Sequence, residues 1–147
     1  MRLSAGPLSG LTPLQVHQLY KLRVDVFVHE QQCTYAEIDD TDARETTVHI
    51  CAWSDTGSQL LGTARLFPVG GEWQFGRFCL IPGARGTGVA RQIMEKALEL
   101  GAGRPMILDA QAPLVPYYEA HGFRVCGGLF DDEGVPHQPM RRDSTGR

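Results

Sequence analysis

The spacing of apolar residues predicts a helix close to the start of the chain. From Val16 to Phe27, apolar side chains recur three or four positions apart, which places them on one face of a helix. Thr12 and Gln15 form a capping box, and the proline that follows Thr12 suits the first helical position. The predicted helix therefore begins after Thr12, and Arg23 is a cation within its apolar stripe.

An acidic segment without regular periodicity follows, from Glu30 to Glu45. We predict a loop with one helical turn there, because no apolar spacing persists across it. The segment contains Asp39, Asp40 and Asp42. A buried arginine needs an opposite charge beside it, so we predict that Arg23 pairs with this loop. The alternative is that Arg23 binds an acidic acceptor.

Short apolar and alternating runs predict the strands, and helical spacing predicts two more helices. The strands are expected at Val48–Trp53, Leu60–Phe67, Trp73–Ile81, Met106–Ala110, Phe123–Phe130 and Gln138–Arg142, and the helices at Val89–Leu100 and Leu114–His121. Short connections between the first three strands favour an antiparallel meander. Strand, helix and strand follow one another directly only between Trp73 and Ala110, so we expect a parallel pair there, within an α/β (α+β) fold.

Length and composition limit the class of protein. The 147 residues fit one domain, which we expect to span residues 1–147, with a frayed tail over residues 143–147. A net charge of −3 argues against a nucleic-acid partner. No apolar run approaches the roughly 20 residues of a membrane-spanning helix. Residues 1–10 lack the apolar core of a signal peptide, so we expect a cytoplasmic protein without a membrane partner.

The cysteines indicate neither a metal site nor a disulfide framework. They stand at Cys33, Cys51, Cys79 and Cys126, without a C-x-x-C pair and without histidines at the spacing of metal ligands. A chain of this size does not need disulfides to fold. We therefore expect free thiols in a reducing compartment and no bound metal.

The candidate chemistry lies in the turn after the third predicted strand. Its sequence is Arg85-Gly86-Thr87-Gly88-Val89-Ala90. Unpaired N–H groups and the helix dipole make the start of a helix attract phosphate, and glycines let main-chain amides converge on an anion. Arg85 adds a cation, so the turn suits a diphosphate. The plain alternative is a glycine-rich turn that only bends the chain.

Two other phosphate-binding loops do not fit this turn. A Walker loop requires Gly-Lys-Ser/Thr at the start of the helix, where this chain has Val89 and Ala90 after Gly88. A dinucleotide fingerprint requires a third glycine at the position that Arg91 occupies.

Two motifs in register resemble the GCN5-related N-acetyltransferase (GNAT) superfamily. Arg85-x-x-Gly88-x-Ala90 matches its R/Q-x-x-G-x-G/A signature, and Tyr118 stands four residues before Gly122-Phe123, as in its second hallmark. The order of the elements agrees over nearly the whole chain. Segments around Arg23 and at Gly134–His137 resemble the ElaA-like group in particular. The resemblance implies a mixed, mostly antiparallel central sheet of six to seven strands, flanked by about four helices.

The resemblance also implies acetyl-CoA as the co-substrate and an amine as the acceptor. A splayed third strand would pair through its main chain with the pantetheine arm at Phe78, Cys79 and Leu80. The Leu80 amide would hold the thioester oxygen as it becomes negative. The main chain from Arg85 to Ala90, including Gly86, Thr87, Gly88 and Val89, would hold the pyrophosphate. Gln111 would contact pantetheine in place of an asparagine that is common in the superfamily.

Proton transfer is implied at Tyr118, which would protonate the departing thiolate. Phenol and thiol have pKa values of roughly 10 and roughly 8.5, close enough for transfer. The neighbouring Tyr117 has the same chemistry, and only the spacing favours Tyr118. The general base is left open among Glu30, His137, His49 and Asp39, with a water chain as an alternative. Glu30 and His137 come first because their segments border the acceptor cleft in this fold.

Other functions also fit parts of the sequence. Arg23 and Phe27, followed by an acidic cluster, resemble acyl-homoserine-lactone synthases, which share this fold and take acyl chains from carrier protein. A tryptophan of that family is missing here. A CoA-binding module without turnover is a further alternative. The sequence does not identify the acceptor, and it leaves open a monomer or a homodimer.

Overall fold

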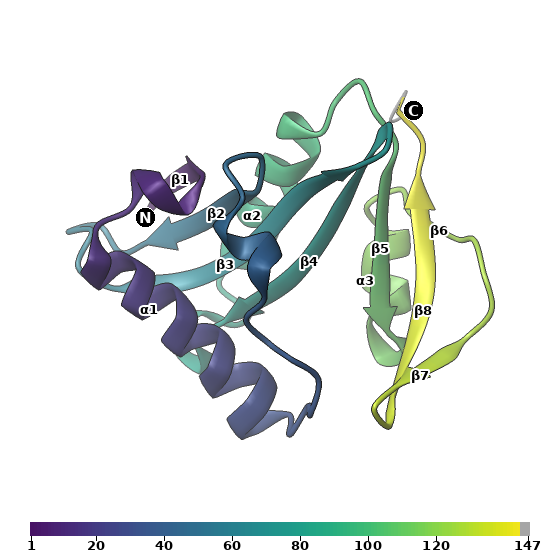
Figure 1. Cartoon of the computed structure of the whole chain (residues 1–147), viewed down its shortest axis with the longest axis horizontal. Helices are drawn as coiled ribbons and strands as arrows, with labels where there is room; N and C mark the ends of the chain where they lie inside the picture. The colour runs from purple at the N-terminus through teal and green to yellow at the C-terminus, as the bar shows by residue number, and fades with distance from the viewer. Residues whose placement is uncertain (145–147) are drawn as a thin grey trace.

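The computed structural model describes residues 1–144, which form an eight-stranded sheet flanked by helices (Figure 1). The strands are β1 (Arg2–Gly6), β2 (Val48–Trp53), β3 (Leu60–Val69), β4 (Glu72–Leu80), β5 (Met106–Gln111), β6 (Arg124–Val125), β7 (Phe130–Asp132) and β8 (Val135–Arg142). Their order is β1-β2-β3-β4-β5-β8-β6, and β7 pairs with β8 outside this path. All pairs are antiparallel except β4 and β5, which confirms the predicted parallel pair.

Helices cover both faces of the sheet. The α-helices are α1 (Pro13–Arg23), α2 (Val89–Leu100) and α3 (Val115–Glu119); α1 continues into a π-helix, η2 (Val24–Glu30), and the short 3₁₀ segments are η1 (Leu8–Gly10), η3 (Asp40–Ala43), η4 (Pro82–Ala84) and η5 (Ala112–Leu114). In Figure 1, α1 lies in front of the sheet and α2 behind it. Within residues 1–144, each helix is too short or too polar to cross a bilayer.

The two faces bury separate cores because successive strand residues point in opposite directions. On one face, Leu19 of α1 and Phe27 of η2 pack with Cys51 of β2. On the other face, Ile93 of α2 packs with Ile50 of β2. The part of the sheet from β2 to β4 is therefore buried on both sides, whereas, among the described residues, the core on the face of α1 contains none from β5 or β8.

Local signals fixed the start of α1. The Thr12 hydroxyl accepts a hydrogen bond from the Gln15 amide, and the Gln15 side chain accepts one from the Thr12 amide, which confirms the capping box. The single turn η3 confirms the helical turn expected in the acidic segment.

Of the four cysteines, Cys126 is exposed and the others are buried, all as free thiols.

Other expectations are corrected by the structure. The predicted strand Phe123–Phe130 is wrong: the chain pairs only over the two short strands β6 and β7. Gly127 and Gly128 weaken a strand there, and the facing Pro139 has no N–H with which to extend the pairing. Residues 2–6, assigned to no element from the sequence, form β1 by pairing with β2.

The implied counts also change. The sheet has eight strands rather than six to seven, and the described residues contain three α-helices rather than about four. The predicted helix Leu114–His121 shortens to α3, because Leu114 belongs to the 3₁₀ turn η5 and the amides of His121 and Gly122 bond three residues back, to Tyr118 and Glu119. Residues 145–147 of the expected tail lie outside the described residues.

Candidate active site

The sheet opens where β4 and β5 diverge. The two parallel strands pair only through Trp73 and Gln74 of β4. Beyond that point β4 carries a bulge, because Arg77 and Phe78 together oppose Ala64 of β3, and Arg77 adopts a φ of 50°. A bulge bends the strand that carries it. The two strands consequently separate toward the carboxyl end of β4 (Figure 1).

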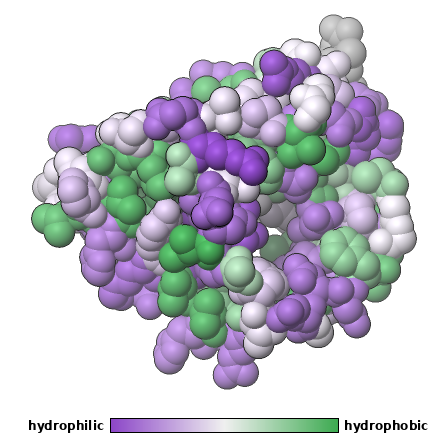
Figure 2. All heavy atoms as spheres, in the orientation of Figure 1, coloured by the Kyte–Doolittle hydropathy of each residue, from purple (hydrophilic) through white to green (hydrophobic). Residues whose placement is uncertain are grey.

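A cavity of about 190 Å³ occupies this opening. Its lining comes from both faces of the sheet: Phe27 and Gln31 lie at the end of η2, whereas Tyr118 belongs to α3. The strands β5 and β8 contribute Gln111 and His137. Figure 2 shows the surface hollowed between the part of the molecule that carries α1 and η2 and the part formed by β5 and β8. The cavity is a place where two ligands that approach from opposite faces can meet.

Tyr118 presents a free hydroxyl to the cavity. The residue is 6% exposed, and its ring packs edge-on against Phe75 and Phe123. The hydroxyl has no hydrogen-bond partner within residues 1–144. Burial raises the pKa of Tyr118, so the group stays protonated at neutral pH and can donate a proton. The hydroxyl of Tyr117 is also buried and unpartnered, but Tyr117 does not line the cavity.

His137 presents a free ring nitrogen to the same cavity. The residue is 7% exposed, and its ring stacks on Phe130 and meets the edge of Tyr35. Its Nδ1 lies 2.8 Å from the carbonyl oxygen of Val135. A carbonyl only accepts, so Nδ1 carries the proton and Nε2 of the neutral ring keeps its lone pair. Because Nε2 bonds to no residue in the described chain, it can accept a proton.

Two carboxylates flank His137 on the strands beside it. His137 faces Gln111 across the β5–β8 pair and Phe130 across the β7–β8 pair. Asp109 and Asp132 each lie two residues along those strands, on the same face, and both line the cavity. Burial raises the pKa of Asp109, and the charge of His137 opposes the rise.

The turn before α2 is open to an anion. Gly88 is the N-cap at a φ of 92°, Gly86 has a φ of 75°, and no side chain of the described residues caps this helix start. A Cβ built on either glycine would meet no atom within 4 Å. The uncapped helix start and the open space at the two glycines fit a diphosphate, although the Thr87 amide already donates to the Ala84 carbonyl.

Arg85 lies beside this turn in an ion pair with Glu30. Its Nη1 and Nη2 donate to the two carboxylate oxygens at 2.9 and 2.8 Å, and Nη2 also donates to the Leu80 carbonyl at 3.2 Å. The hydrogen bonds from Arg85 lower the pKa of Glu30. The structure thus places Glu30 next to the anion-binding turn, and Glu30 does not line the cavity.

Gln111 spans the opening between β5 and the first helical region. Its Nε2 donates to Oε1 of Gln31 at 2.8 Å, and both residues line the cavity. Gln31 follows the π-helix, and its amide bonds to the carbonyl of Val26 five residues earlier. Such π segments often occur at functional sites. Here the wider turn carries Phe27 and Gln31 to the cavity.

The expected pantetheine residues of β4 lie beside the bulge. The Phe78 side chain lines the cavity, whereas Cys79 and Leu80 bury their side chains in the cores on the two faces. Burial raises the pKa of the Cys79 thiol, which therefore stays neutral. The side chains of Cys79 and Leu80 therefore do not reach the cavity, the Leu80 carbonyl accepts from Arg85, and Cys79 pairs with Thr63 of β3.

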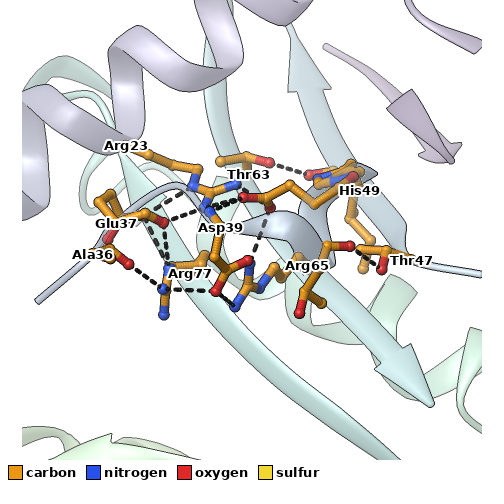
Figure 3. Close-up of polar contacts among 12 residues, drawn as sticks. Arg23, Ala36, Glu37, Asp39, Thr47, His49, Thr63, Arg65 and Arg77 are labelled. Carbon is orange, nitrogen blue, oxygen red and sulfur yellow. Dashed lines mark hydrogen bonds and ion pairs between the residues drawn. The ribbon is translucent and has the colours of Figure 1, made fainter. Parts of the chain in front are cut away.

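The remaining base candidates, His49 and Asp39, belong to a buried ionic network rather than to the cavity. We use this name for Arg23, Glu37, Asp39, Asp42, Arg65 and Arg77, several of which are labelled in Figure 3. His49 adjoins the network, because its Nε2 donates to the Asp42 carbonyl at 2.9 Å. Burial lowers the pKa of His49, which keeps the ring neutral.

Arg23 is the centre of the buried ionic network. It is 1% exposed, donates to Asp42 at 2.7 Å and to Glu37 at 2.9 Å, and so confirms the predicted pairing with the acidic loop. Arg65 holds Asp39 at 2.8 Å. Arg77 lies 3.1 Å from the Glu37 carboxylate. These contacts fasten the acidic loop to the sheet (Figure 3). The same loop carries Tyr35, which lines the cavity.

The charges of this network are held in their ionised forms to different degrees. Burial alone would raise the pKa of Asp42, but hydrogen bonds from Arg23 and its charge hold that pKa at about 2. Burial raises the pKa of Glu37 even though Arg77 and Arg23 oppose the rise. The network is therefore strongest around Asp42, whose side chain is fully buried.

Sequence reasoning missed several residues of the cavity. Asp109 had a signal, because it is the one charged residue in the apolar run of β5. Asp132 had none, because it lay in an ordinary polar turn. Arg77 and Tyr35 lie far apart in the sequence, and the tertiary structure brings the Arg77 guanidinium over the Tyr35 ring.

Comparisons with known proteins agree with this geometry. The family model described as an acetyltransferase (GNAT) domain matches residues 14–144. A UPF0039 protein of Mycobacterium tuberculosis is 39% identical over 137 residues, covering 90% of this chain and 86% of that protein. Protein ElaA of Escherichia coli is 32% identical over 142 residues and 92% of each chain.

Solved structures give the same result. The crystal structure of Escherichia coli ElaA covers 97% of this chain and 99% of its own, with a TM-score of 0.88. An acyl-CoA N-acyltransferase from Pseudomonas aeruginosa also has a TM-score of 0.88, at 34% identity, with the same coverage of 97% and 99%. A CoA-dependent acyl-homoserine lactone synthase, at 19% identity and a TM-score of 0.78, shares the fold alone; it spans 96% of this chain and 82% of its own.

Proposed function

The chain belongs to the GNAT acetyltransferase family, whose fold supports acyl transfer from a CoA thioester, and from that premise we propose that it moves an acetyl group from acetyl-CoA to an amine. The observation that carries the proposal is the free Tyr118 hydroxyl in a cavity that also holds the free Nε2 of His137. The acetyltransferase unit is proposed to be residues 1–147. The free thiols suit the cytoplasmic location that we propose with it.

The anion-binding turn holds the donor in this proposal. The amides from Gly86 to Ala90 bind the pyrophosphate, with the α2 dipole behind them. Arg85 turns from Glu30 toward the phosphates or bridges the two. The main chain of β4 from Phe78 to Leu80 pairs with the pantetheine arm. Gln111 releases its hydrogen bond to Gln31 and donates to that arm instead. The support is the open space above the glycines and the separation of β4 from β5.

Two side chains move protons as the bonds change. The amine nitrogen attacks the thioester carbon after His137 Nε2 has taken a proton from the ammonium form. The Leu80 amide stabilises the oxyanion that develops. The carbon–sulfur bond then breaks, and Tyr118 gives its proton to the thiolate. The second proton of the attacking nitrogen is lost as the neutral amide forms, and through solvent it restores the Tyr118 phenol. Burial raises the pKa of the Tyr118 phenol. The same dry site favours a neutral CoA thiol over a thiolate, so the pKa values of the two groups rise together and proton transfer remains feasible.

The contacts rank the candidate bases. His137 Nε2 faces the cavity without a partner, whereas both oxygens of Glu30 accept hydrogen bonds from Arg85. We therefore assign the base to His137 and give Glu30 a positioning role at Arg85. The free Tyr118 hydroxyl favours turnover over a CoA-binding module, because mere binding does not need a proton donor there.

The donor site is tested by Gly88→Glu, with acetyl-CoA binding measured by calorimetry. The new carboxylate and bulk occupy the anion-binding turn, so we expect a loss of affinity of at least about 100-fold. Gly70→Glu is the matched control, because Gly70 also has a positive φ and open space but lies in the β3–β4 turn. Equal affinity of both variants would remove the turn from the donor site.

The reaction itself is tested by following release of the CoA thiol. Wild-type protein is given acetyl-CoA and, separately, acylated carrier protein, each with a panel of amines. We expect thiol release with acetyl-CoA that depends on an amine. Release from carrier protein alone would favour the acyl-homoserine-lactone synthase type of reaction instead.

A further inference from the structure

The wall of the cavity that surrounds His137 carries two carboxylates without cationic partners. Asp109 and Asp132 form no ion pair within residues 1–144. Other acidic side chains near the site are paired: Glu30 with Arg85, and Glu37 with Arg23. Asp109 is exposed and Asp132 is half-buried, and their two negative charges at one cavity favour a ligand that brings positive charge.

The opposite wall does not supply that charge. Arg77 is the cation among the described residues that line the cavity. Its Nε lies 3.1 Å from Glu37, its Nη2 lies 3.6 Å from Asp39, and it also donates to the carbonyl of Ala36. Arg77 is thus already neutralised, and the field within the cavity is set by the two free carboxylates.

The sheet register places those carboxylates on both sides of the reacting position. Asp109 of β5 and Asp132 of β7 are diagonal neighbours of His137 on the same face of the sheet. Diagonal neighbours lie about 7–8 Å apart, so each carboxylate lies a short carbon chain away from a nitrogen bound at His137. The buried, unpartnered hydroxyl of Tyr118 independently marks the cavity as a ligand site.

We propose that the acceptor is a dicationic amine of the diamine or polyamine class, and that the negative potential of Asp109 and Asp132, one on each side of His137, attracts its second ammonium group while His137 faces the first. This inference rests on the proposed acetyl transfer and names the substrate class of that same cavity. A neutral amine would leave both carboxylates uncompensated. An amino acid would bring its own carboxylate beside them, which like-charge repulsion disfavours.

The test compares two acceptors of equal length, cadaverine and aminopentanol, in which a hydroxyl replaces the second amine. Initial rates of CoA thiol release give kcat/KM for each acceptor with wild-type protein, Asp109→Asn, Asp132→Asn and the double variant. We expect wild type to prefer cadaverine by at least about tenfold, each substitution to reduce kcat/KM for cadaverine by about tenfold, and each to reduce it several-fold less for aminopentanol, so that the preference shrinks.

Asp131→Asn is the matched control, because Asp131 is the exposed neighbour of Asp132 and does not line the cavity. It should leave the preference unchanged. Acetyl-CoA binding by each variant, measured in parallel, shows that the variant is folded. Should a variant fail this check, salt titration of the wild-type preference replaces it, and the preference should shrink as salt screens the charges.

Several outcomes would overturn the inference. They are equal kcat/KM for the two acceptors with wild type, a preference that survives in the double variant, or turnover of neither acceptor. Transfer to aminopentanol with no preference would keep the proposed acetyl transfer and reject only the dicationic acceptor. Absence of acetyl-CoA binding by wild type would instead reject the proposed function.

Discussion

The buried ionic network and the cavity contain the same kinds of side chain but use them differently. In the network, Arg23 meets Asp42 and Glu37 with almost no exposure to water. In the cavity, the Tyr118 hydroxyl, the His137 Nε2 and the two carboxylates lack partners within residues 1–144. Every charged side chain of the network has an ion-pair partner, although Oε1 of Glu37 and Nε of Arg65 are buried without a hydrogen bond. The two regions meet at Arg77, which belongs to the network and also lines the cavity.

The difference indicates which polar groups hold shape and which are free for chemistry. A buried charge with a partner stabilises one geometry, since breaking the pair leaves an uncompensated charge. A buried polar group without a partner costs free energy until a ligand satisfies it. The network therefore keeps the acidic loop in place, and the cavity retains unmet hydrogen-bonding capacity for substrates.

The largest expected effect comes from breaking the network at its centre. Arg23→Ala removes the buried cation that Asp42 and Glu37 share and leaves each with one arginine, Arg65 or Arg77, so we expect the free energy of unfolding to fall by about 3–5 kcal/mol. Urea denaturation measures it. Lys21→Ala is the control: it removes an exposed pair with Asp25 and should cost less than about 1 kcal/mol. Similar losses for both variants would contradict the structural role of the network.

Removing the free hydroxyl of the cavity should affect rate rather than stability. We expect Tyr118→Phe to lower kcat by about 100-fold, equivalent to about 2.7 kcal/mol of activation free energy, with little change in acetyl-CoA affinity. Steady-state kinetics and calorimetry measure the two quantities. Tyr117→Phe removes a buried hydroxyl outside the cavity and should leave kcat unchanged. An unchanged kcat for Tyr118→Phe would remove that hydroxyl from the mechanism.

The network should also respond to acid. The folded-state pKa of Asp42, about 2, lies below its ordinary value of 3.8, so the carboxylate contributes stability above pH 3.8 and loses it as pH falls toward 2. By linkage the contribution is about 2 kcal/mol. The difference in unfolding free energy between wild type and Asp42→Asn should be constant above about pH 4 and shrink below it. A difference independent of pH would show that Asp42 does not carry this charge.

The smallest expected effect concerns the exposed pair at the edge of the site. Glu30→Gln releases Arg85 and removes a negative charge beside the anion-binding turn, so we expect acetyl-CoA to bind about threefold more tightly. kcat should stay unchanged if His137 is the base. A fall of about 100-fold in kcat would instead transfer that role to Glu30. Calorimetry and steady-state kinetics distinguish the two results.

Local sequence was a good guide wherever a few neighbouring residues decide the structure. The capping box at Thr12, the glycines before α2 and the parallel β4–β5 pair all follow from short-range rules, and the structure contains each of them. The predicted strand Phe123–Phe130 was wrong at Gly127 and Gly128. There the facing Pro139 has no N–H, which ends the pairing with β8. β1 escaped prediction because its strand exists only through pairing with β2.

In the candidate site, too, local sequence predicts some features and the tertiary structure decides others. Motif spacing selected Tyr118 over Tyr117, and only Tyr118 reaches the cavity. The spacing could not separate Glu30 from His137 as a base. Their roles depend on Arg85, which is 55 residues from Glu30 in the chain.

The sequence by itself determined the family, the glycine-rich turn before α2 and the pairing of Arg23, because each depends on residue type at fixed short spacing or on the rule that a buried charge needs a partner. Only the tertiary structure decided that Asp109, His137 and Asp132 share one face. They lie on three strands whose register is a long-range property, and a shift of one residue would turn any of them away from the cavity.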